Sequence, residues 1–536
     1  MDRLQEVYVP ALPPQRLRGV LGPARLGEFL AEAAATLPVL DQRAVLNVNS
    51  TATGGGVAEM LHTLLAYTRG IGIDTRWFVV SAESDFFAVT KRLHNHIYGF
   101  SGDGGPLGEE EHKIYARTLA PNLTEMLAIV RPGDVVLLHD PQTAGLTSAL
   151  KDAGAQVVWR CHIGSDERNE FSDIGWSFLQ RYVERADGFV FSRTSFAPEW
   201  MPRYKVVPIR PSLDPFSPKN QEMDPDIVRS ALVHAGLLAG KTGPEPVPVF
   251  RRRDGSPLRV DRHADVLQSG QAPDPDAPLV VQISRWDAMK DMPGVMKGFA
   301  DGVALETDAH LMLAGPSVAG VADDPEGAEV LDACTRQWRA LPHAIRSRVH
   351  LACLPMRDME ENAAIVNALQ RHAAIVTQKS LAEGFGLTVV EAMWKRRPVI
   401  GTAIGGIADQ IVDGESGLLV QDPNDLEEFA GAVRRILKDP LLSARLGKGA
   451  FERAHERFLA DRHLETWAHL IRGDLLSERA ETGHRSWRSR RSHTPSTACP
   501  TPQGAKCSIP AISSRSSRRS TWAGPGPSMP ARSVWL

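Results

Sequence analysis

The stretch EGFGLTVVEAMWKRRPVIG, residues 383–401, sets two carboxylates around a glycine-bracketed turn. The apolar run AAIVTQKS (373–380) leads into it and predicts a buried strand. Glu383 would then follow the carboxyl end of that strand, where open α/β sheets bind ligands. A helix beginning near Leu387 would direct its first N–H groups toward the same place and favour a phosphate. The stretch therefore predicts an α/β fold with a ligand site at this turn.

Short apolar runs alternate with helical or loop segments on both sides of this stretch. The later half of the chain adds LVVQISR, HLMLAGP, RVHLACLP and GLLVQD, and the earlier half contains AVLNVNS, RWFVVS, DVVLLHD, AQVVWRCHI and GFVFS. Such alternation predicts mostly parallel sheets covered by helices. One domain of this length would exceed the size at which single cores stop growing. We therefore predict two Rossmann-like, doubly wound domains that face a cleft.

Changes of composition suggest where these domains begin and end. We expect a helical lead-in over 1–40, a first domain over 41–215, a second over 216–455, and a helix over 456–475 that crosses back to the first domain. The proline-rich run VPIRPSLDPFSPKN (207–220) marks the boundary between the two domains. Residues 241–278 are rich in proline, glycine and charge, and predict an irregular segment.

The bulk composition is that of an ordinary globular enzyme. The 536 residues carry a net charge of −3 and are 43% hydrophobic. We find neither a membrane-spanning run nor a secretory signal, and we expect a cytoplasmic protein without membrane or nucleic-acid partners. Scattered cysteines without metal-ligand spacing predict reduced thiols and no zinc site, namely Cys161, Cys334, Cys353, Cys499 and Cys507.

The last part of the chain has a different character. Residues 482–536 contain no Asp or Glu and are dominated by Arg, Ser, Pro and Gly. A basic, low-complexity stretch of this kind cannot bury a core, so we predict that it is disordered. It is typical either of a tail for anionic surfaces or of a spurious extension of the gene product. We favour the second interpretation and assign the tail no role.

Two clusters of polar residues would lie at the mouth of the second crevice. Arg285 and Lys290 follow a buried strand, and two cations there would stabilise a departing diphosphate. Glu391 suits the vicinal hydroxyls of a ribose, and Glu383 the hydroxyls of a transferred sugar. Alternatively, Arg285 and Lys290 are surface cations paired with Asp287 and Asp291. Glu391 would then only interact with the helix dipole in the first turn, and Glu383 would be a solvated loop acid.

The first crevice offers weaker signals. In the turn TATGGGVAEML (51–61), Gly55 and Gly56 are candidates for diphosphate contact, although a tight turn without a ligand fits as well. A nicotinamide site, with Glu83 as the acid for the ribose, fits poorly because the G-x-G-x-x-G spacing is missing. His162 and Asp140 each end an apolar strand and would hydrogen-bond sugar hydroxyls. On chemistry alone, a structural role is favoured for both.

Together these motifs resemble the family-4 retaining glycosyltransferases of GT-B fold. The resemblance rests on EGFGLTVVE, SRWDAMKD and the first glycine loop, and it covers about residues 40–470. Longer strings, such as HDPQ, WRCHIG and PSLDPFSPKN, are similar to the trehalose-forming branch. Members of that branch join glucose from a nucleoside diphosphate to free glucose.

The resemblance implies a role for each candidate residue. Gly55 and Gly56 would contact the donor phosphates, Arg285 and Lys290 the diphosphate, Glu391 the ribose and Glu383 the donor glucose. His162 would lie beside the donor sugar and Asp140 in the acceptor pocket. The turn residues Gly384, Phe385, Gly386, Leu387 and Thr388 would bind the donor. The sequence departs from the family pattern at Gly164, where the family often has Asp. The identity of the acceptor is therefore left open.

Three functions are compatible with these residues. The first is retaining glucosyl transfer to glucose or to another sugar, in which the acceptor attacks on the face that the diphosphate leaves, with no metal or cofactor. The second is a retaining trehalose phosphorylase, and the third is an inactive sugar-nucleotide-binding protein. Expected partners are sugars and sugar nucleotides. The nucleotide base and a homodimeric state are left open.

Overall fold

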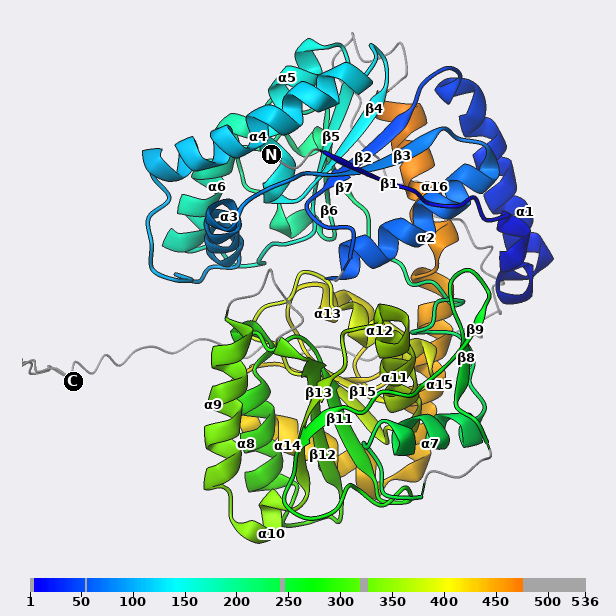
Figure 1. The fold of residues 1–536 in the computed structure, drawn as a ribbon, viewed down its shortest axis with the longest axis vertical. Coiled ribbons are helices and arrows are strands. Elements are labelled where there is room, and N and C mark those ends of the chain that lie inside the picture. The colour runs from blue at the N-terminus through cyan, green and yellow to red at the C-terminus, as the bar shows by residue number, and fades with distance from the viewer. Residues whose placement is uncertain (1–3, 54, 242–245, 319–325, 476–536) are drawn as a thin grey trace, which may run out of the picture. The chain divides into compact units, whose positions relative to one another are not determined.

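The computed structural model describes residues 4–53, 55–241, 246–318 and 326–475. All of these residues fall in one compact unit that spans residues 1–485 (Figure 1). The predicted disordered tail, 482–536, lies outside the described residues. Among the described helices, none combines the length and the apolar character needed to cross a membrane.

A first sheet has seven strands in the order β1-β3-β2-β4-β5-β6-β7. All neighbouring pairs are parallel except β1 with β3. Its strands are β1 (Gln5–Val7), β2 (Val45–Asn49), β3 (Thr75–Val79), β4 (Val135–His139), β5 (Gln156–Cys161), β6 (Gly188–Phe191) and β7 (Val206–Pro208). We call this sheet and its helices the N-terminal lobe.

A second sheet of seven strands has the order β10-β13-β12-β11-β14-β15-β16. Here only β10 runs antiparallel to its neighbour. Its strands are β10 (Asp265–Leu267), β11 (Leu279–Ile283), β12 (His310–Pro316), β13 (Val349–Leu354), β14 (Ile375–Gln378), β15 (Val399–Thr402) and β16 (Leu418–Val420). This sheet and its helices form the C-terminal lobe. Both sheets confirm the predicted Rossmann-like, doubly wound architecture.

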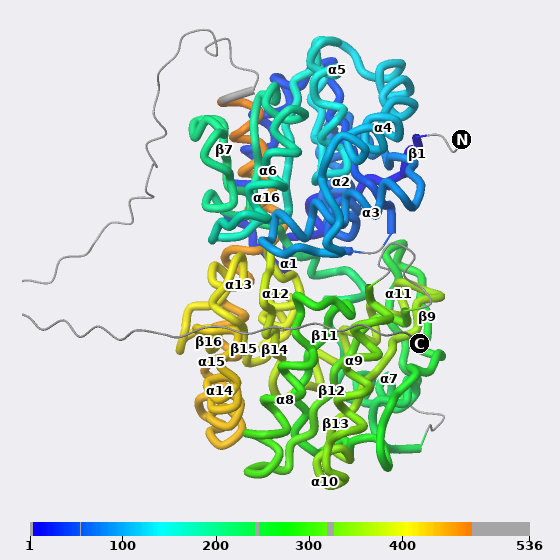
Figure 2. The backbone as a smooth tube through the Cα atoms, turned by 90° about the vertical axis from the view of Figure 1, so that its left-hand side faces the viewer, coloured from blue at the N-terminus to red at the C-terminus, as the bar shows by residue number. Residues whose placement is uncertain are grey.

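Helices connect the strands of each sheet (Figures 1 and 2). In the N-terminal lobe they are α1 (Arg18–Thr36), α2 (Gly55–Ile71), α3 (Ser84–Ile97), α4 (Glu109–Ile129), α5 (Thr147–Asp152) and α6 (Glu170–Val183). In the C-terminal lobe they are α7 (Pro225–His234), α8 (Met292–Gly302), α9 (Gly327–Ala340), α10 (His343–Arg346), α11 (Met359–His372), α12 (Leu387–Trp394), α13 (Gly405–Gln410), α14 (Leu426–Lys438) and α15 (Pro440–Arg457).

Short 3-10 segments complete the secondary structure, and the last helix returns to the first lobe. The 3-10 segments are η1 (Pro14–Leu17), η2 (Leu37–Leu40), η3 (Pro141–Leu146), η4 (Thr194–Phe196), η5 (Arg203–Lys205) and η6 (Ala288–Lys290). After α15, which contacts α12 and β15, the helix α16 (Ala460–Leu470) contacts α1 and α2 and continues into a π-helical turn, Ile471–Leu475. The last described helix thus lies against the N-terminal lobe.

Acidic caps explain where several of these helices begin. Asp224, Asp358 and Asp425 each precede a helix and accept a hydrogen bond from a backbone N–H of its first turn. Such a side chain satisfies one of the N–H groups that the helix itself leaves without a partner. Proline at the first position of α7 and of α15 fixes a helical φ where no N–H is needed.

Two segments differ from what the sequence predicts. The helical lead-in over 1–40 is incomplete, because β1 precedes α1 and pairs along the edge of β3. Residues 241–278 contain β10 and a hairpin of β8 (Val249–Arg251) with β9 (Pro257–Arg259). All three of these strands are only three residues long, too short for alternation to reveal them.

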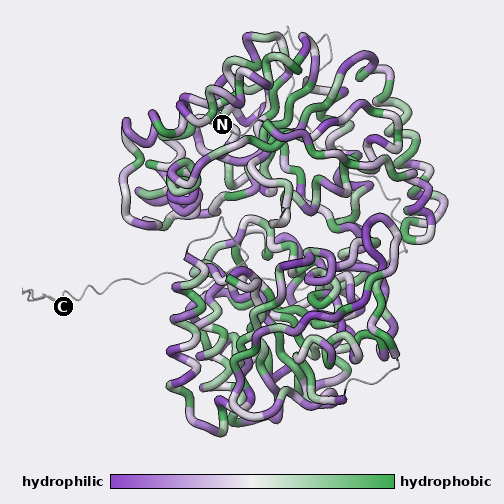
Figure 3. Tube along the Cα trace, viewed as in Figure 1, coloured by the Kyte–Doolittle hydropathy of each residue, from purple (hydrophilic) through white to green (hydrophobic). Residues whose placement is uncertain are grey.

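Apolar side chains fill both faces of each sheet, and Figure 3 shows hydrophobic residues concentrated along the strands. One face of the first sheet packs its Leu46, Val136 and Val157 against α3, α4 and α6. The opposite face packs Val45, Val135 and Leu137 against Trp467 and Leu470 of α16. Parallel sheets need such cover on both faces.

Strand order fixes where ligands are expected. In the first sheet the direction of winding reverses between β2 and β4, and in the second between β11 and β14. These are the topological switch points, where α/β sheets bind ligands beyond the carboxyl ends of the strands. The candidate residues follow these strands: Gly55 and Gly56 follow β2, Asp140 follows β4, Arg285 and Lys290 follow β11, and Glu383 follows β14. His162 follows β5, one strand further along.

Candidate functional site

The switch point of the second sheet brings together two of the predicted residues. The Nζ of Lys290 donates a 2.7 Å hydrogen bond to Oε2 of Glu383. Lys290 lies at the end of η6 and Glu383 in the turn after β14, so two separate crossovers supply the pair. Glu383 is only 9% exposed. Glu383 and Lys290 therefore form a hydrogen-bonded ion pair, which holds the two side chains in place.

Arg285 lies beside the same pair. Its Nη2 donates to Oδ2 of Asp287 at 3.3 Å, as one of the alternatives from the sequence supposes. Burial favours the neutral acid at Asp287, but Lys91, Arg285 and Lys290 together hold its pKa below the ordinary value. Lys290 pairs with Glu383 rather than with Asp291, which binds Lys379 instead. Arg285 and Lys290 thus lie on the same side of this switch point, each ion-paired with a carboxylate, Asp287 and Glu383 respectively.

The glycine turn after β14 is shaped by close packing. Gly386 has φ +82° and caps the N-terminus of α12, a conformation that side chains other than glycine rarely adopt. Phe385 is buried and makes an edge contact with Phe458 at 5.7 Å between ring centroids. The carbonyl of Thr388 accepts a hydrogen bond from Nε2 of Gln370 at 3.3 Å. The first N–H groups of α12 thus have a fixed orientation.

Gly56 meets this helix from the other lobe. A Cβ on Gly56 would lie 2.5 Å from Cδ1 of Leu387, the first residue of α12. Gly55, with φ +73°, begins α2, and a Cβ on it would have no neighbour within 4 Å. The starts of α2 and α12 therefore approach each other closely, and the N-terminus of a helix carries a partial positive charge.

Glu391 lies in a buried cluster of charges. Lys219 places its Nζ 2.6 Å from Oε2 of Glu59 and 3.6 Å from Oε1 of Glu391. The Nζ of Lys395 donates to Oδ1 of Asn220 at 2.9 Å and to the carbonyl of Glu391 at 3.1 Å. Burial raises the pKa of Glu391, and Lys219 opposes that rise. Glu391, together with Glu59, lines a small pocket.

At the first switch point, His162 ends a chain of hydrogen bonds. Its Nε2 lies 3.1 Å from Nδ1 of His139, and Nε2 of His139 lies 3.2 Å from Oδ1 of Asn47. Burial lowers the pKa of His139 to about 3 and that of His162 well below 6.5, so both rings are neutral. With the amide oxygen of Asn47 toward His139, each ring donates along the chain and Nδ1 of His162 is left as an acceptor.

Asp140 positions this histidine. Its Oδ1 accepts a hydrogen bond from the backbone N–H of His162 at 2.7 Å. Its backbone has φ 63° and ψ 176°, a region that is essentially restricted to glycine and costs about 1–3 kcal/mol. Burial raises the pKa of the Asp140 carboxyl to about 7, which the His162 N–H and Arg160 partly oppose. Strain and a perturbed carboxyl at a strand end are both typical of functional sites.

The two lobes touch where these residues lie. A Cβ on Gly384 would fall 2.3 Å from the carbonyl oxygen of His162 and 2.8 Å from the hydroxyl of Tyr98. Burial raises the pKa of Tyr98 well above 10, and Glu383 adds to the effect. Gly384 is therefore the close-approach point between the predicted donor and acceptor residues.

Gly164 has a packing reason to lack a side chain. A Cβ at this position would lie 2.4 Å from the ring of Phe196. The next acid along the chain, Asp166, binds Arg193 and accepts from the N–H of Gly405 in the other lobe at 3.2 Å. An aspartate at 164 would require Phe196 to move, so this departure from the family pattern follows from local packing.

Several residues at the site escape prediction from the sequence. Lys219 comes from the proline-rich linker, His139 and Asn47 from strands, and Tyr98 from the end of α3. Only the tertiary structure brings them next to Glu391, His162 and Gly384.

Known proteins match both lobes. The family model described as "Trehalose synthase, N-terminal domain" matches residues 47–198, and that described as "Glycosyl transferases group 1" matches residues 267–453. The trehalose synthase of Pyrococcus horikoshii is 34% identical over 433 residues, which cover 81% of this chain and 90% of that protein.

More distant similarities extend in two directions. A trehalose phosphorylase of Pleurotus sajor-caju is 26% identical, over 76% of this chain and 54% of that protein. The crystal structure of an α,α-trehalose-phosphate synthase (UDP-forming) from Burkholderia vietnamiensis shares the fold, with a TM-score of 0.58 and 15% identity over 80% of this chain and 96% of that one. On the match to the Pyrococcus enzyme and to both family models, the chain belongs to the trehalose synthase family and is a glycosyltransferase of GT-B fold.

Proposed function

We propose that this enzyme transfers glucose from a nucleoside diphosphate glucose to free glucose, with retention, and forms α,α-trehalose. The observation that carries the proposal is the hydrogen-bonded pair of Lys290 and Glu383, beside Arg285 and against the strand end that holds His162. A nucleoside diphosphate sugar carries both groups that this arrangement suits: a dianionic diphosphate and a neutral sugar with several hydroxyls.

The cations would act on the leaving group. Lys290 has three N–H donors, and Glu383 takes one of them among the described residues, so two would remain for diphosphate oxygens. Arg285 and the first N–H groups of α12 would add to the same stabilisation. As the bond between the anomeric carbon and the diphosphate breaks, negative charge builds on the diphosphate, and fixed positive groups lower the barrier.

The neutral histidine would act on the sugar. An uncharged ring with Nδ1 as an acceptor can bind a hydroxyl without competing for the diphosphate. In the proposed same-face reaction, an acceptor hydroxyl oxygen bonds to the anomeric carbon while the diphosphate departs, and the hydroxyl proton passes to a diphosphate oxygen. Glu391 would hold the ribose hydroxyls and Asp140 the acceptor pocket. The reaction needs no metal, so we expect activity to persist in EDTA.

Product analysis tests this proposal. The purified protein is incubated with glucose and, in turn, UDP-, ADP-, GDP- and TDP-glucose, with and without inorganic phosphate, and products are identified by NMR. We expect α,α-trehalose with at least one donor and no requirement for phosphate. Release of free glucose alone, or an inverted linkage, would contradict the proposal.

A second candidate is phosphorolysis of trehalose, which the similarity to the Pleurotus phosphorylase favours. Inorganic phosphate would then occupy the place of the diphosphate beside Lys290 and Arg285. Glucose 1-phosphate formed from trehalose and phosphate, without nucleotide, would replace the first proposal by this one. Binding of a sugar nucleotide without any turnover would instead indicate an inactive binding protein.

A further inference from the structure

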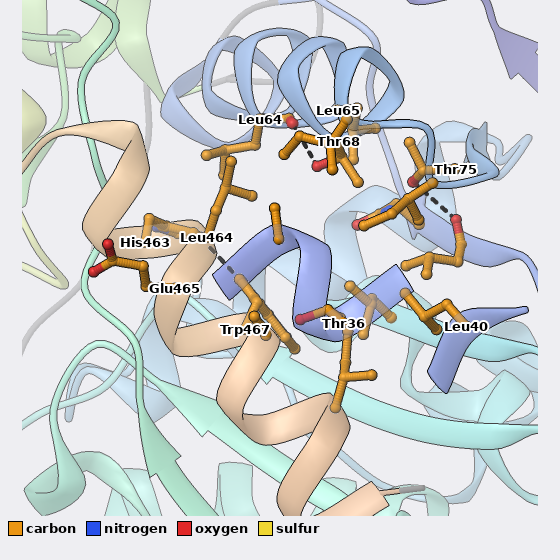
Figure 4. A pocket seen from close by; sticks show the side chains of 18 of the residues that line it. Thr36, Leu40, Leu64, Leu65, Thr68, Thr75, His463, Leu464, Glu465 and Trp467 are labelled. Atoms are coloured by element: carbon orange, nitrogen blue, oxygen red, sulfur yellow. Dashed lines mark hydrogen bonds between the residues drawn. The ribbon is translucent and has the colours of Figure 1, made fainter. Parts of the chain in front are cut away.

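A cavity of about 80 Å³ lies in the N-terminal lobe, on the face of the first sheet that α16 covers (Figure 4). Its walls come from α1, η2, α2 and α16 and from strands β2, β3, β4 and β5. A cavity needs only about 10–15 Å³ to hold one water, and one of about 150 Å³ binds benzene. This cavity therefore has room for a small organic molecule.

Most of the lining is apolar. Figure 4 shows Leu64 and Leu65 of α2, Leu40 of η2 and Trp467 of α16 gathered around the space. Two carboxylates that also line it are each engaged by an arginine outside the lining: Glu32 by Arg472, and Glu465 by Arg462 at 3.0 Å. Neither carboxylate is therefore available to a cation inside the cavity.

At its polar end, the lining contains a buried arginine. Arg160 is 2% exposed, and among the described residues no carboxylate lies within 4.0 Å of its guanidinium. It hydrogen-bonds to Nε2 of His463 at 3.1 Å and to the carbonyl of Ile209 at 3.4 Å, and it lies 5.6 Å from the centroid of the Trp467 ring. These hydrogen-bond partners are neutral, and the Asp140 carboxyl balances the charge only in part, because burial still lowers the pKa of Arg160 to about 9.

A second polar group at this end has an atom without a partner. Asn47 is 2% exposed and lines the cavity, and its Nδ2 has no hydrogen-bond partner among the described residues. Its Oδ1 is occupied by His139. Leaving a buried amide N–H unsatisfied costs about 1–3 kcal/mol, so such groups in folded proteins usually meet a ligand or a water.

We propose that this cavity is a binding site for a small monocarboxylate, whose carboxylate meets Arg160 and Asn47 and whose short apolar tail lies among the leucines of α2 and Trp467. Charge, hydrogen bonding and shape each support this class. An anion balances the guanidinium, carboxylate oxygens accept from Nδ2 of Asn47, and the remaining wall excludes a second charged group. The site is separate from the sugar site, although His139 contacts both the cavity and His162.

Binding of butanoate to the native protein tests the charge requirement. Butanoate has a carboxylate and a three-carbon tail, butanamide has the same shape without the charge, and acetate has the charge without the longer tail. Isothermal titration at constant ionic strength should give one site with a Kd of about 1 mM for butanoate. We expect butanamide and acetate each to bind at least about tenfold more weakly than butanoate. Butanamide lacks the charge, and acetate lacks two buried methylenes.

A pair of α1 variants tests the location. Ala33 lines the cavity and is 7% exposed, whereas its neighbour Ala34 is exposed and outside the lining. Ala33→Leu should fill the cavity and abolish butanoate binding, and Ala34→Leu should leave the Kd unchanged. Arg160→Met should also abolish binding, while Arg160→Lys should retain part of it.

Two results would overturn the proposal. One is equal binding of butanoate and butanamide, or binding of neither, by the native protein; this measurement does not depend on whether any variant folds. The other is undiminished butanoate binding by a folded Ala33→Leu variant, which would place the ligand elsewhere.

Discussion

The two switch points share a topology, but the polar side chains at one form ion pairs and those at the other are largely uncharged. At the second sheet, Lys290 and Glu383 form an ion pair at 2.7 Å, with Arg285 and Asp287 beside them. At the first sheet, burial keeps His162 neutral and holds the Asp140 carboxyl to a pKa of about 7. In the proposed function, the side at the second sheet would bind the diphosphate and the side at the first sheet the uncharged hydroxyls of a sugar.

This difference explains how one fold can serve a transfer reaction. Positive charge near a diphosphate stabilises its departure, whereas positive charge near an acceptor hydroxyl would attract the diphosphate to the wrong place. Neutral groups on the acceptor side avoid that competition. Gly384 brings the two sides into contact, because its missing side chain lets His162 and Tyr98 approach.

The largest expected effect is on turnover, and it tests the charged side. Lys290→Ala should lower kcat by about 10²–10³, because it removes a group that stabilises the leaving diphosphate. The donor KM should change only a few-fold. Steady-state kinetics with the preferred donor checks this, with Lys297→Ala as the matched control, since Lys297 is exposed and binds Asp301 at 2.6 Å. An unchanged kcat would remove Lys290 from the mechanism.

A smaller effect is expected on donor affinity. Glu391→Gln should raise the donor KM by about 10–100-fold and leave kcat within a few-fold, because a charged acceptor for the ribose hydroxyls is lost while Lys219 keeps its bond to Glu59. Calorimetric titration of the nucleoside diphosphate measures the change directly. Equal affinity for native protein and variant would mean that the ribose is bound elsewhere.

The neutral side offers a test of strain. Asp140→Ala and Asp140→Gly both remove the hydrogen bond to His162, but only glycine adopts φ 63°, ψ 176° without strain. Both variants should raise the acceptor KM to a similar extent. The glycine variant should be more stable by about 1–2 kcal/mol in urea unfolding. Equal stabilities would show that the backbone at 140 is not strained.

The last prediction concerns the pH dependence of stability. The pKa of Asp140 is raised from 3.8 to about 7, so between these values the folded protein holds a proton that the unfolded chain has lost. Stability from this group therefore falls as pH rises from about 4 to 7 and is constant above. Asp140→Asn keeps the acceptor oxygen but cannot titrate.

Other buried groups titrate in the native protein and in the Asp140→Asn variant alike, so the difference between their free energies of unfolding isolates the contribution of Asp140. We expect the free energy of unfolding of the native protein, relative to the Asn variant, to fall across this range in urea titrations at several pH values. A difference that stays constant with pH would contradict the raised pKa.

Much of this arrangement is predictable from the sequence, for physical reasons. Strands such as DVVLLHD and LVVQISR are buried on both faces and read as continuous apolar runs, and parallel strands end at one edge of a sheet. These two regularities are enough to predict that Glu383, Lys290 and Asp140 lie near ligand sites. The three-residue strands β1 and β10 have too few positions for a pattern, and the sequence does not reveal them.

Pairings between distant segments are beyond a sequence-based argument. Lys219 reaches both Glu59 and Glu391 only because the linker passes between α2 and α12. The pKa of His162 is lowered by burial and by Arg160, which itself hydrogen-bonds to His463 some 300 positions further along the chain. The role of the pair Lys290 and Glu383 remains a prediction, although their hydrogen bond is in place.

The most direct measurement is a crystal structure with the nucleoside diphosphate of the preferred donor and trehalose bound together. We predict that diphosphate oxygens lie within hydrogen-bond distance of Lys290 and of the first N–H groups of α12, and that a glucose hydroxyl contacts His162. A diphosphate bound away from Lys290 and Arg285, or a sugar with no contact to His162, would contradict the proposal that one switch point binds the diphosphate and the other the sugar.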